Sequence, residues 1–464
     1  MSIKETKFGG GLRRARQILG GKNALVVGLA NTGVSASRFL KKCGAKVTAT
    51  DMRPLEELPA AKELIDSGVK IAAGGHKGIT FNSGELVVVS PGVPYDIPLL
   101  NEAREKGAEV ISDIELAYRF IDAPIIAIAG TNGKTTTTTL IGRILEDAGK
   151  KVFVGGNIGT PAVEYVENEG DADFVVLEIS SFHLETTKDF NPHIGILLNI
   201  TEDHLDRYRD FDHYAETKFR LFENQDECDW AVVNVGDPVI RKRFEGGFGK
   251  GKAVPFTVSG APGRGLFLKD NAVVFIKDGK QELYPVAGFR LRGLHNIENI
   301  MSVIAAARLA GIPEEVIKKT LSEFEGLHHR MEFVRELEGV TYIDDSKGTN
   351  IGALVMALRG LGGNVVLIAG GRDKGGDYRV LSGLVKEKVK LLVLIGEARF
   401  KIKEALGSLA ETVIVDTFED AVKLSHERAA AGDTVLLCPA CSSFDMFKSY
   451  KERGERFRKL VEAL

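Results

Sequence analysis

Seven consecutive residues between an apolar run and a helix-forming run have the composition of a phosphate-binding loop. They are Gly130, Thr131, Asn132, Gly133, Lys134, Thr135 and Thr136. Glycines let backbone N–H groups approach phosphate oxygens, and the N-terminus of a following helix favours negative charge. A lysine at this position can reach the β- and γ-phosphates, and the next hydroxyl can bind Mg²⁺. We therefore predict that the loop binds ATP or GTP.

The segments beside the loop favour this interpretation over a glycine turn that only caps a helix. Residues 124–129 are short, apolar and bounded by Pro and Gly, as in a buried parallel strand, and residues 137–147 have helical spacing. The general pattern has a glycine five residues before Gly133, where this chain has Ile128. The loop is therefore a shorter variant.

Two later strands of the same region should bring polar groups to the loop. Residues 173–178 are apolar and end in Glu178, and residues 194–198 lead into a polar loop that contains His204. In open α/β sheets, ligands bind at the carboxyl ends of strands. Glu178 is a natural magnesium ligand and His204 a less usual one; taken alone, His204 reads as an ordinary hydrogen-bonding histidine.

The N-terminal region resembles a dinucleotide-binding unit. A strand over residues 23–28, a helix from Gly33 and a second strand that ends in Asp51 follow in order. The middle glycine of the usual fingerprint is missing between Gly28 and Gly33, so we expect a Rossmann-like site for another nucleotide rather than a standard NAD site.

The C-terminal region repeats the strand-and-loop pattern, with strands over residues 340–344, 364–369, 391–395 and 434–438. The polar loops at 345–350, 370–374 and 440–443 should face one edge, where lysines and hydroxyls could hold a small carboxylate. The alternative is that these loops are solvated connections.

Length and composition place these regions in a three-domain α/β protein of 464 residues. We expect a Rossmann-like domain over 1–112, a central P-loop ATPase-type domain with a mostly parallel sheet over 113–326, and a second Rossmann-like domain over 327–464. The basic N-terminus lacks the apolar core of a secretory signal, no apolar run is long enough to span a bilayer, and the net charge of −3 argues against nucleic-acid binding. Four cysteines fit a reducing, cytoplasmic setting, and Cys438 and Cys441 lack the partners of a zinc site.

Six motifs occur in the order found in the Mur ligases, so nearly the whole chain resembles that family. They are residues 130–135, 178–182, 199–204, 295–299, 329–330 and 345–350. The Ser-Ser-Phe sequence after Glu178 and the motif at 345–350 are similar to the branch that adds D-glutamate. The resemblance implies an ATP- and Mg²⁺-dependent ligase in peptidoglycan precursor synthesis. It would join D-glutamate to UDP-N-acetylmuramoyl-L-alanine through an acyl phosphate, as a cytoplasmic monomer.

The resemblance also implies roles for single residues. Catalytic roles fall to Lys134, Lys218, His204 and Lys347, and metal binding to Thr135, Glu178, His204 and Lys218. ATP would also contact Asn296, Asn299, Arg330 and Asp345. The nucleotide substrate would contact Asn31, Thr32, Asp51, Arg53, Gly92, Asn157 and Ser180. D-glutamate would contact Thr349, Lys374, Ser443 and Tyr450.

The local sequence and the family resemblance give different expectations for Lys218. Its own context indicates an exposed helical lysine, whereas the resemblance implies a carbamylated lysine that binds a second magnesium ion. The chain departs from the family pattern at His183, where glutamine is expected, at Met52, where a hydroxyl residue is usual, and at Tyr450, which replaces another aromatic ring.

Three other functions remain open at this point. The first is an amide ligase of the same fold that adds another amino acid or acts on a folate, against which the motif at 345–350 speaks. The second is a regulatory or transport ATPase, which would turn over ATP without an amino acid. The third and weakest is an NAD-dependent dehydrogenase, which would leave the phosphate loop without a role.

Overall fold

The structure is a computed structural model that describes residues 10–81, 84–205, 207–247, 249–260, 263–277, 279–291 and 293–464. The first nine residues of the basic N-terminus thus lie outside the described part. The chain divides into two compact units. One comprises Met1–Asn199, Tyr214–Gly288 and Glu298–Ser322, and the other comprises Ile200–His213, Phe289–Ile297 and Glu323–Leu464.

The first sheet is parallel throughout and has the strand order β3-β2-β1-β4-β5. Its strands are β1 (Asn23–Val27), β2 (Lys46–Asp51), β3 (Lys70–Ala73), β4 (Leu86–Val89) and β5 (Glu109–Ser112). The helices of this region are α1 (Gly11–Leu19), α2 (Asn31–Lys42), η1 (Leu55–Glu57), α3 (Ala61–Asp66), α4 (Pro98–Glu105) and α5 (Asp113–Tyr118). Because both faces of a parallel sheet are covered, β4 is buried along its whole length.

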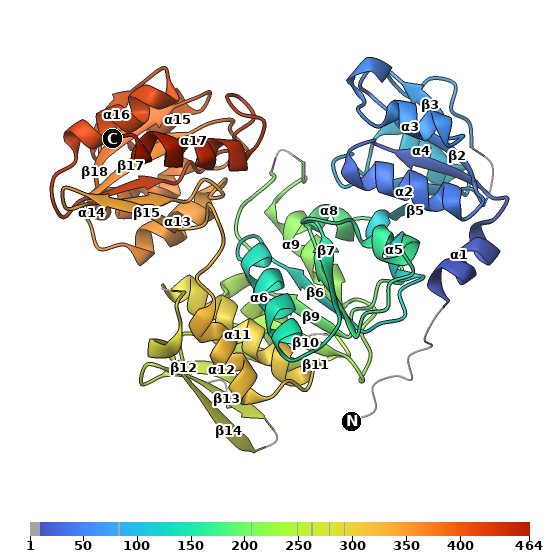
Figure 1. Ribbon diagram of the computed structural model, residues 1–464, viewed down its shortest axis with the longest axis horizontal. Helices are drawn as coiled ribbons and strands as arrows, with labels where there is room; N and C mark the ends of the chain where they lie inside the picture. Colours follow the sequence, from blue (N-terminus) through green and yellow to red (C-terminus); the bar gives the residue numbers. More distant parts are fainter. Residues whose placement is uncertain are drawn as a thin grey trace. The chain divides into compact units, whose positions relative to one another are not determined.

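The second sheet has the order β14-β13-β12-β11-β10-β9-β6-β8-β7, and only its β12-β13-β14 end is antiparallel (Figure 1). Its strands are β6 (Ile125–Ala129), β7 (Val152–Gly156), β8 (Phe174–Glu178), β9 (Ile194–Leu197), β10 (Trp230–Asn234), β11 (Lys252–Thr257), β12 (Gly265–Lys269), β13 (Ala272–Lys277) and β14 (Lys280–Pro285). The strand before the phosphate loop, β6, lies between β8 and β9. The loops after these three strands therefore meet at one edge.

The helical segments of this middle region connect and cover the second sheet. They are α6 (Lys134–Asp147), α7 (Ala162–Glu167), α8 (Ser181–Leu184), α9 (Phe211–Phe219), η2 (Arg220–Phe222), α10 (Pro238–Glu245), η3 (Val286–Gly288), α11 (Leu294–Leu309) and α12 (Glu314–Glu323). Helix α6 packs on β6, β7 and β8. It begins at Lys134, three residues earlier than the spacing predicted, so the lysine lies in the first turn.

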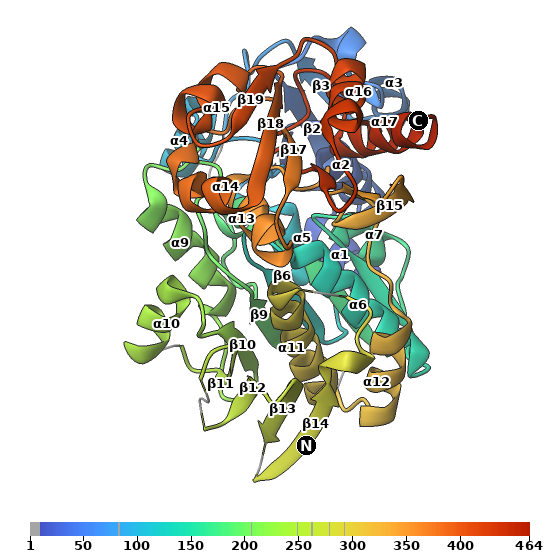
Figure 2. The ribbon, with the colours of Figure 1, turned by 90° about the vertical axis from the view of Figure 1, so that its left-hand side faces the viewer.

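The third sheet has the order β15-β16-β20-β17-β18-β19, and only β15 is antiparallel to its neighbour. Figure 2 shows β17, β18 and β19 side by side. The strands are β15 (Glu332–Leu337), β16 (Val340–Asp344), β17 (Val365–Gly370), β18 (Val389–Ile395), β19 (Glu411–Ile414) and β20 (Thr434–Leu437). The helical segments are α13 (Ile351–Gly360), η4 (Tyr378–Leu381), α14 (Ser382–Lys388), α15 (Arg399–Leu406), α16 (Phe418–Arg428) and α17 (Tyr450–Glu462).

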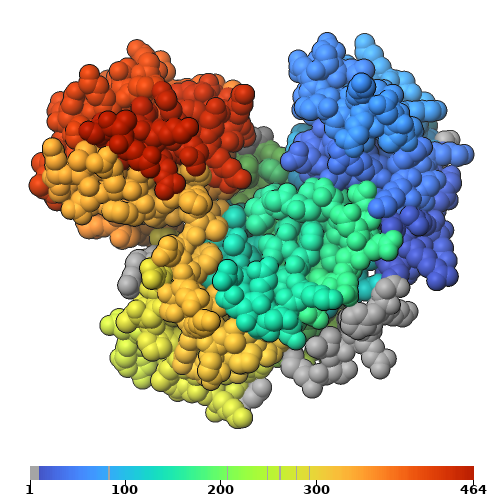
Figure 3. All heavy atoms as spheres, viewed as in Figure 1, coloured from blue at the N-terminus to red at the C-terminus, as the bar shows by residue number. Residues whose placement is uncertain are grey.

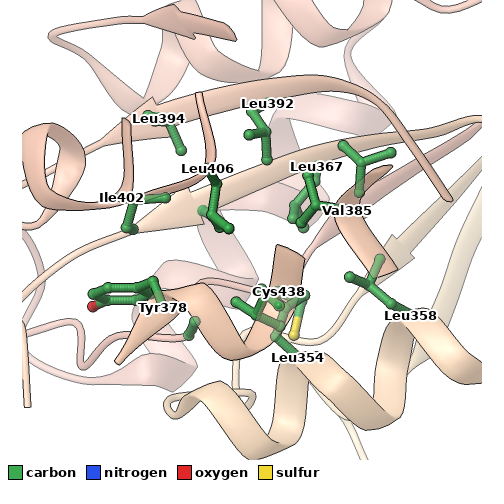
Figure 4. Close-up of a cluster of buried hydrophobic side chains, with 14 of the residues drawn as sticks. Leu354, Leu358, Leu367, Tyr378, Val385, Leu392, Leu394, Ile402, Leu406 and Cys438 are labelled. Atoms are coloured by element: carbon green, nitrogen blue, oxygen red, sulfur yellow. The ribbon is translucent and has the colours of Figure 1, made fainter. Parts of the chain in front are cut away.

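Alternating side chains of the third sheet build two separate cores. Leu367 and Leu392 pack with Leu354 of α13 on one face, as Figure 4 shows. Their neighbours Ile368 and Val393 pack with α16 and α17 on the other face. The orange and red atoms of this domain form one continuous body (Figure 3).

The predicted fold class, an α/β protein with three mostly parallel sheets, is confirmed. The domain boundaries after residues 112 and 326 remain predictions. Within the described ranges, no helix has both the length and the apolar character needed to cross a membrane.

Candidate functional site

The phosphate loop is held in shape by the residue that follows β9. The backbone N–H of Thr131 donates to the carbonyl oxygen of Asn199 at 2.9 Å. The N–H of Asn132 donates to Oδ1 of Asn199 at 2.8 Å, and Nδ2 of Asn199 donates back to the carbonyl of Asn132 at 3.1 Å. Asn199 thus fixes the first half of the loop, a role that the sequence analysis did not assign.

Two loop positions require glycine. Gly133 has φ of +85°, and a Cβ there would lie 2.2 Å from Oδ1 of Asn299 on α11. Gly130 has φ of +147°, and its Cβ would lie 3.0 Å from Cβ of Leu198. L-residues rarely adopt such backbone angles, so both glycines allow the close approach that the loop needs. The predicted ATP residue Asn299 therefore contacts the loop itself.

Two lysines converge on the loop. Nζ of Lys134 donates to the carbonyl oxygens of Gly130 and Thr131, both at 2.8 Å. Nζ of Lys218 donates to the carbonyl of Gly130 at 3.0 Å and lies 4.6 Å from the ring centre of Tyr214. Lys218 is only 2% exposed, so its interpretation as an exposed helical lysine is wrong. Its burial arises because its helix, α9, packs it against the loop.

Glu178 lies buried at the end of β8, next to the loop strand. Its Oε1 accepts a hydrogen bond from Nδ2 of Asn157 at 2.8 Å, whereas Oε2 has no hydrogen-bond partner among the residues that the structure describes. A buried carboxylate oxygen in this state is costly unless a cation or a donor meets it. The carboxylate therefore fits a magnesium ligand.

The predicted nucleotide-substrate residues of the first domain lie at the carboxyl edge of the first sheet. Asn31 and Thr32 begin α2, and Asp51 ends β2. The carboxylate of Asp51 accepts from the N–H of Leu29 at 2.7 Å and from Nε and Nη2 of Arg53 at 3.0 and 2.8 Å. Burial disfavours the charge on Asp51, but these hydrogen bonds outweigh it and lower its pKa to about 2. This edge therefore presents a fixed carboxylate and an adjacent arginine.

Gly92 follows β4, so it belongs to the same carboxyl edge. The turn after β1 requires glycine, since a Cβ on Gly33 would lie 1.8 Å from the carbonyl of Gly28. The two glycines of the imperfect fingerprint thus have a packing role.

The second unit brings together the three C-terminal loops that the sequence analysis singled out, because β16, β20 and β17 are neighbours. Asp345 is buried and accepts a hydrogen bond from the Cys438 thiol at 3.1 Å. Burial raises the pKa of Asp345 to about 7. Cys438 and Cys441 are buried free thiols, and Cys441 contacts the hydroxyl of Tyr378 at 3.1 Å.

A carboxylate of the 200–213 segment, Asp203, joins two of these loops. Its Oδ2 accepts from Nδ2 of Asn350 at 3.0 Å, and its Oδ1 lies 3.4 Å from Nζ of Lys374. Nε2 of the adjacent His204 lies 3.6 Å from Oδ2 of Asp203, and His204 has φ of +55°. The loops that contain Asn350 and Lys374 are therefore not merely solvated connections, because Asp203 contacts both of them.

Lys347 and Tyr450 form a second contact in this unit. Nζ of Lys347 lies 4.1 Å from the ring centre of Tyr450, which begins α17. The guanidinium of Arg453, 1% exposed, donates to Oγ and the carbonyl of Ser346 at 3.0 and 2.8 Å. It also lies 3.4 Å from the carbonyl of Cys441. Arg453 thus holds the loop after β16 against the loop after β20.

Asn199, Asp203, Tyr214 and Arg453 are the contacts that the sequence analysis missed. Asn199 and Asp203 stand in the polar loop after a predicted strand, which was a usable signal. Arg453 shares a helix face with Phe457 and Val461 at intervals of four, so its burial could have been read from the pattern. Among the remaining candidates, Thr349 and Ser443 lie in the loops after β16 and β20, Asn296 lies on α11, and Arg330 precedes β15.

Comparisons with known proteins agree with this arrangement. Family models described as Mur ligase MurD-like N-terminal domain, Mur ligase middle domain and Mur ligase glutamate ligase domain match residues 22–112, 128–307 and 329–441. A UDP-N-acetylmuramoylalanine–D-glutamate ligase from Geotalea uraniireducens is 50% identical over 96% of this chain and 98% of its own length. The enzyme of the same name from Geobacter metallireducens is 48% identical over the same shares.

Solved structures share the fold at low identity. A pseudomurein peptide ligase type C from Methanothermus fervidus has a TM-score of 0.61 at 19% identity and covers 96% of this chain and 100% of its own. UDP-N-acetylmuramate-alanine ligase MurC from Thermotoga maritima has a TM-score of 0.57 at 20% identity and covers 95% of this chain and 99% of its own. The relatives are 50% and 48% identical over 96% of the chain, and three family models match its three regions. The chain therefore belongs to the Mur ligase family.

Proposed function

We propose that this protein catalyses the ATP-dependent addition of D-glutamate to UDP-N-acetylmuramoyl-L-alanine, a step of peptidoglycan precursor synthesis. The observation that carries the proposal is the 50% identity to a D-glutamate ligase over 96% of the chain. The phosphate loop, which Asn199 braces and two lysines contact, supports the proposal because such a ligase needs an ATP site. A dehydrogenase would leave this arrangement unused.

The reaction proceeds through two covalent steps. The terminal carboxylate of the nucleotide substrate attacks the γ-phosphorus of ATP, forming an acyl phosphate and releasing ADP. The amine of D-glutamate then attacks the acyl carbon, and the resulting tetrahedral intermediate expels phosphate and leaves an amide. Lys134, whose Nζ contacts the carbonyl oxygens of the loop, would neutralise charge on the transferring phosphoryl group, which is the main demand of this chemistry.

Magnesium would be held by Thr135, Glu178 and His204, and when bound it would neutralise phosphate charge. The buried Oε2 of Glu178, which has no hydrogen-bond partner within the described part of the chain, supports this assignment. A carbamate on Lys218 would give the buried side chain an anionic end for a second ion, and its remaining N–H could still donate to the carbonyl of Gly130. We therefore propose carbamylation of Lys218.

The remaining roles follow the three regions of the chain, with domains over 1–112, 113–326 and 327–464. The uridine diphosphate part of the substrate would contact Asn31, Thr32, Asp51, Arg53 and Gly92, and its remainder Asn157 and Ser180. ATP would contact the loop residues and Asn296, Asn299, Arg330 and Asp345. D-glutamate would contact Thr349, Lys374, Ser443 and Tyr450, with Lys347 beside Tyr450. We propose that the enzyme acts as a cytoplasmic monomer.

Phosphate release from ATP tests the proposal when the purified protein is given UDP-N-acetylmuramoyl-L-alanine and each amino acid in turn. Release that depends on D-glutamate is the expected result. Dependence on another amino acid would overturn the specificity, and release without either substrate would favour a regulatory or transport ATPase. Lys134→Met should abolish release, whereas Lys150→Met, at an exposed lysine just beyond the same helix, should not.

A further inference from the structure

A buried carboxylate and a buried imidazole lie behind Ser180, a side chain that the proposed function places on the substrate. Asp113 and His183 are each 1% exposed, and Nε2 of His183 lies 3.6 Å from Oδ1 of Asp113. Nδ1 of His183 lies 2.8 Å from Oγ of Ser180 and 3.2 Å from the Ser180 backbone nitrogen. Hydrogen bonds therefore join His183 to Ser180 just beyond the end of β8, whereas the Asp113 carboxylate lies beyond hydrogen-bond distance of the ring and has no hydrogen-bond partner among the described residues.

The backbone contact fixes which nitrogen of His183 carries the proton. The N–H of Ser180 can only donate, so Nδ1 must offer its lone pair, and the proton of a neutral ring must be on Nε2, toward Asp113. Burial lowers the pKa of His183 to about 3, which agrees with a neutral ring. The short contact of Nδ1 with Oγ is then a hydrogen bond that the Ser180 hydroxyl donates.

This arrangement also determines whether the Ser180 hydroxyl offers a ligand a hydrogen-bond donor or an acceptor. Its single hydroxyl proton is used on Nδ1, and one lone pair of Oγ accepts the backbone N–H of His183 at 3.3 Å. A hydroxyl has one donor and two acceptor positions, so the remaining position is an acceptor. Ser180 therefore presents an acceptor, and no donor, to a ligand at this edge of the sheet.

We propose that His183 is a positioning residue that fixes Ser180 as a hydrogen-bond acceptor for the nucleotide substrate. The inference rests on the proposed function, because that function places the substrate at Ser180. His183 itself is too deeply buried to touch a ligand. Its effect must therefore pass through Ser180.

Kinetic constants of two His183 variants and of Ser180→Ala test this inference. Leucine removes the acceptor that His183 offers at Nδ1, whereas glutamine, the residue of the family pattern, keeps an acceptor for Ser180 in a Ser-x-x-Gln capping box. His183→Leu should therefore raise the KM for UDP-N-acetylmuramoyl-L-alanine by about tenfold, as expected for one lost hydrogen bond, with the KM for ATP unchanged. His183→Gln should remain within about threefold of the wild type, since it keeps the acceptor for Ser180.

The double variant separates positioning from general damage to the fold. If His183 acts through Ser180, His183→Leu should add nothing to the KM increase of Ser180→Ala. Independent, multiplying effects, or equal losses in the Gln and Leu variants, would overturn the inference. Failure of the wild-type enzyme to use D-glutamate with this nucleotide would instead overturn the proposed function, so the two failures are distinguishable.

Discussion

Replacing Gly133 with alanine should weaken ATP binding through two effects that the loop geometry allows us to estimate. An L-residue at φ of +85° costs about 1–2 kcal/mol relative to glycine. The new Cβ would also lie 2.2 Å from Oδ1 of Asn299, so that side chain must move and lose a contact of about 1 kcal/mol. Without ATP the loop can relax out of this conformation and escape both costs, so ATP binding must restore them, and the sum of about 2–3 kcal/mol corresponds to a Kd for ATP that is about 30- to 150-fold higher.

Titration calorimetry with a non-hydrolysable ATP analogue measures this loss directly. Gly149→Ala is the matched control, because Gly149 follows the other end of α6 at φ of +76°, and no atom of the described residues lies within 4 Å of the position that a Cβ would take there. Gly149→Ala should lower the free energy of unfolding by a similar strain energy and leave the Kd for ATP unchanged. A Kd for Gly133→Ala within threefold of the wild type, or an equal loss in Gly149→Ala, would refute the reasoning.

Three further predictions concern other parts of the first unit. Lys218→Ala should lower turnover by about 100-fold with recovery by acetate or formate, whereas the exposed Lys242→Ala should be silent; normal turnover of the first variant would exclude a role for Lys218. Burial raises the pKa of Asp113 to about 7, so the folded state binds an extra proton between about pH 4 and 7 and stability falls as pH rises through that window. Urea unfolding of Asp113→Asn and of the wild type measures this effect. The unfolding free energy of the variant minus that of the wild type should rise by about 2–3 kcal/mol from pH 5 to pH 8; a difference that stays constant over this range would contradict the raised pKa of Asp113. Glu115→Ala should lower the unfolding free energy by about 3 kcal/mol, because its carboxylate accepts the backbone N–H groups of residues 188–190; a loss below about 1 kcal/mol would show that water replaces them.

The sequence predicted the strands near the site well because each is a short apolar run closed by a polar or glycine-containing turn. The predicted strand over residues 340–344 is β16 to the residue, and β6 and β8 differ from their predicted spans by one residue. Helix starts were less accurate. The loop residues Lys134 to Thr136 carry no helical periodicity, yet tertiary contacts fold them into the first turn of α6.

The candidate site shows where pattern reasoning stops. Motif order predicted which residues would line the site, but the contacts that shape it join distant segments, as with Asn199 and the loop. Lys218 was predicted from its own context to be exposed. This prediction was wrong because the burial of a lysine depends on which distant segments pack over it. His183 was noted only as a departure from the family pattern, since its contact with Asp113 links parts of the chain that no local spacing relates.

The bracing of the phosphate loop by later segments bears on how the enzyme matures during its synthesis. Asn199 lies 67 residues after Asn132, and Asn299 is later still. A growing chain that has emerged only as far as the end of α6 contains every residue of the nucleotide motif without the partners that give it shape. ATP capture thus becomes available only after most of the middle domain has been made, so prematurely terminated chains that carry the motif would neither sequester nor consume nucleotide.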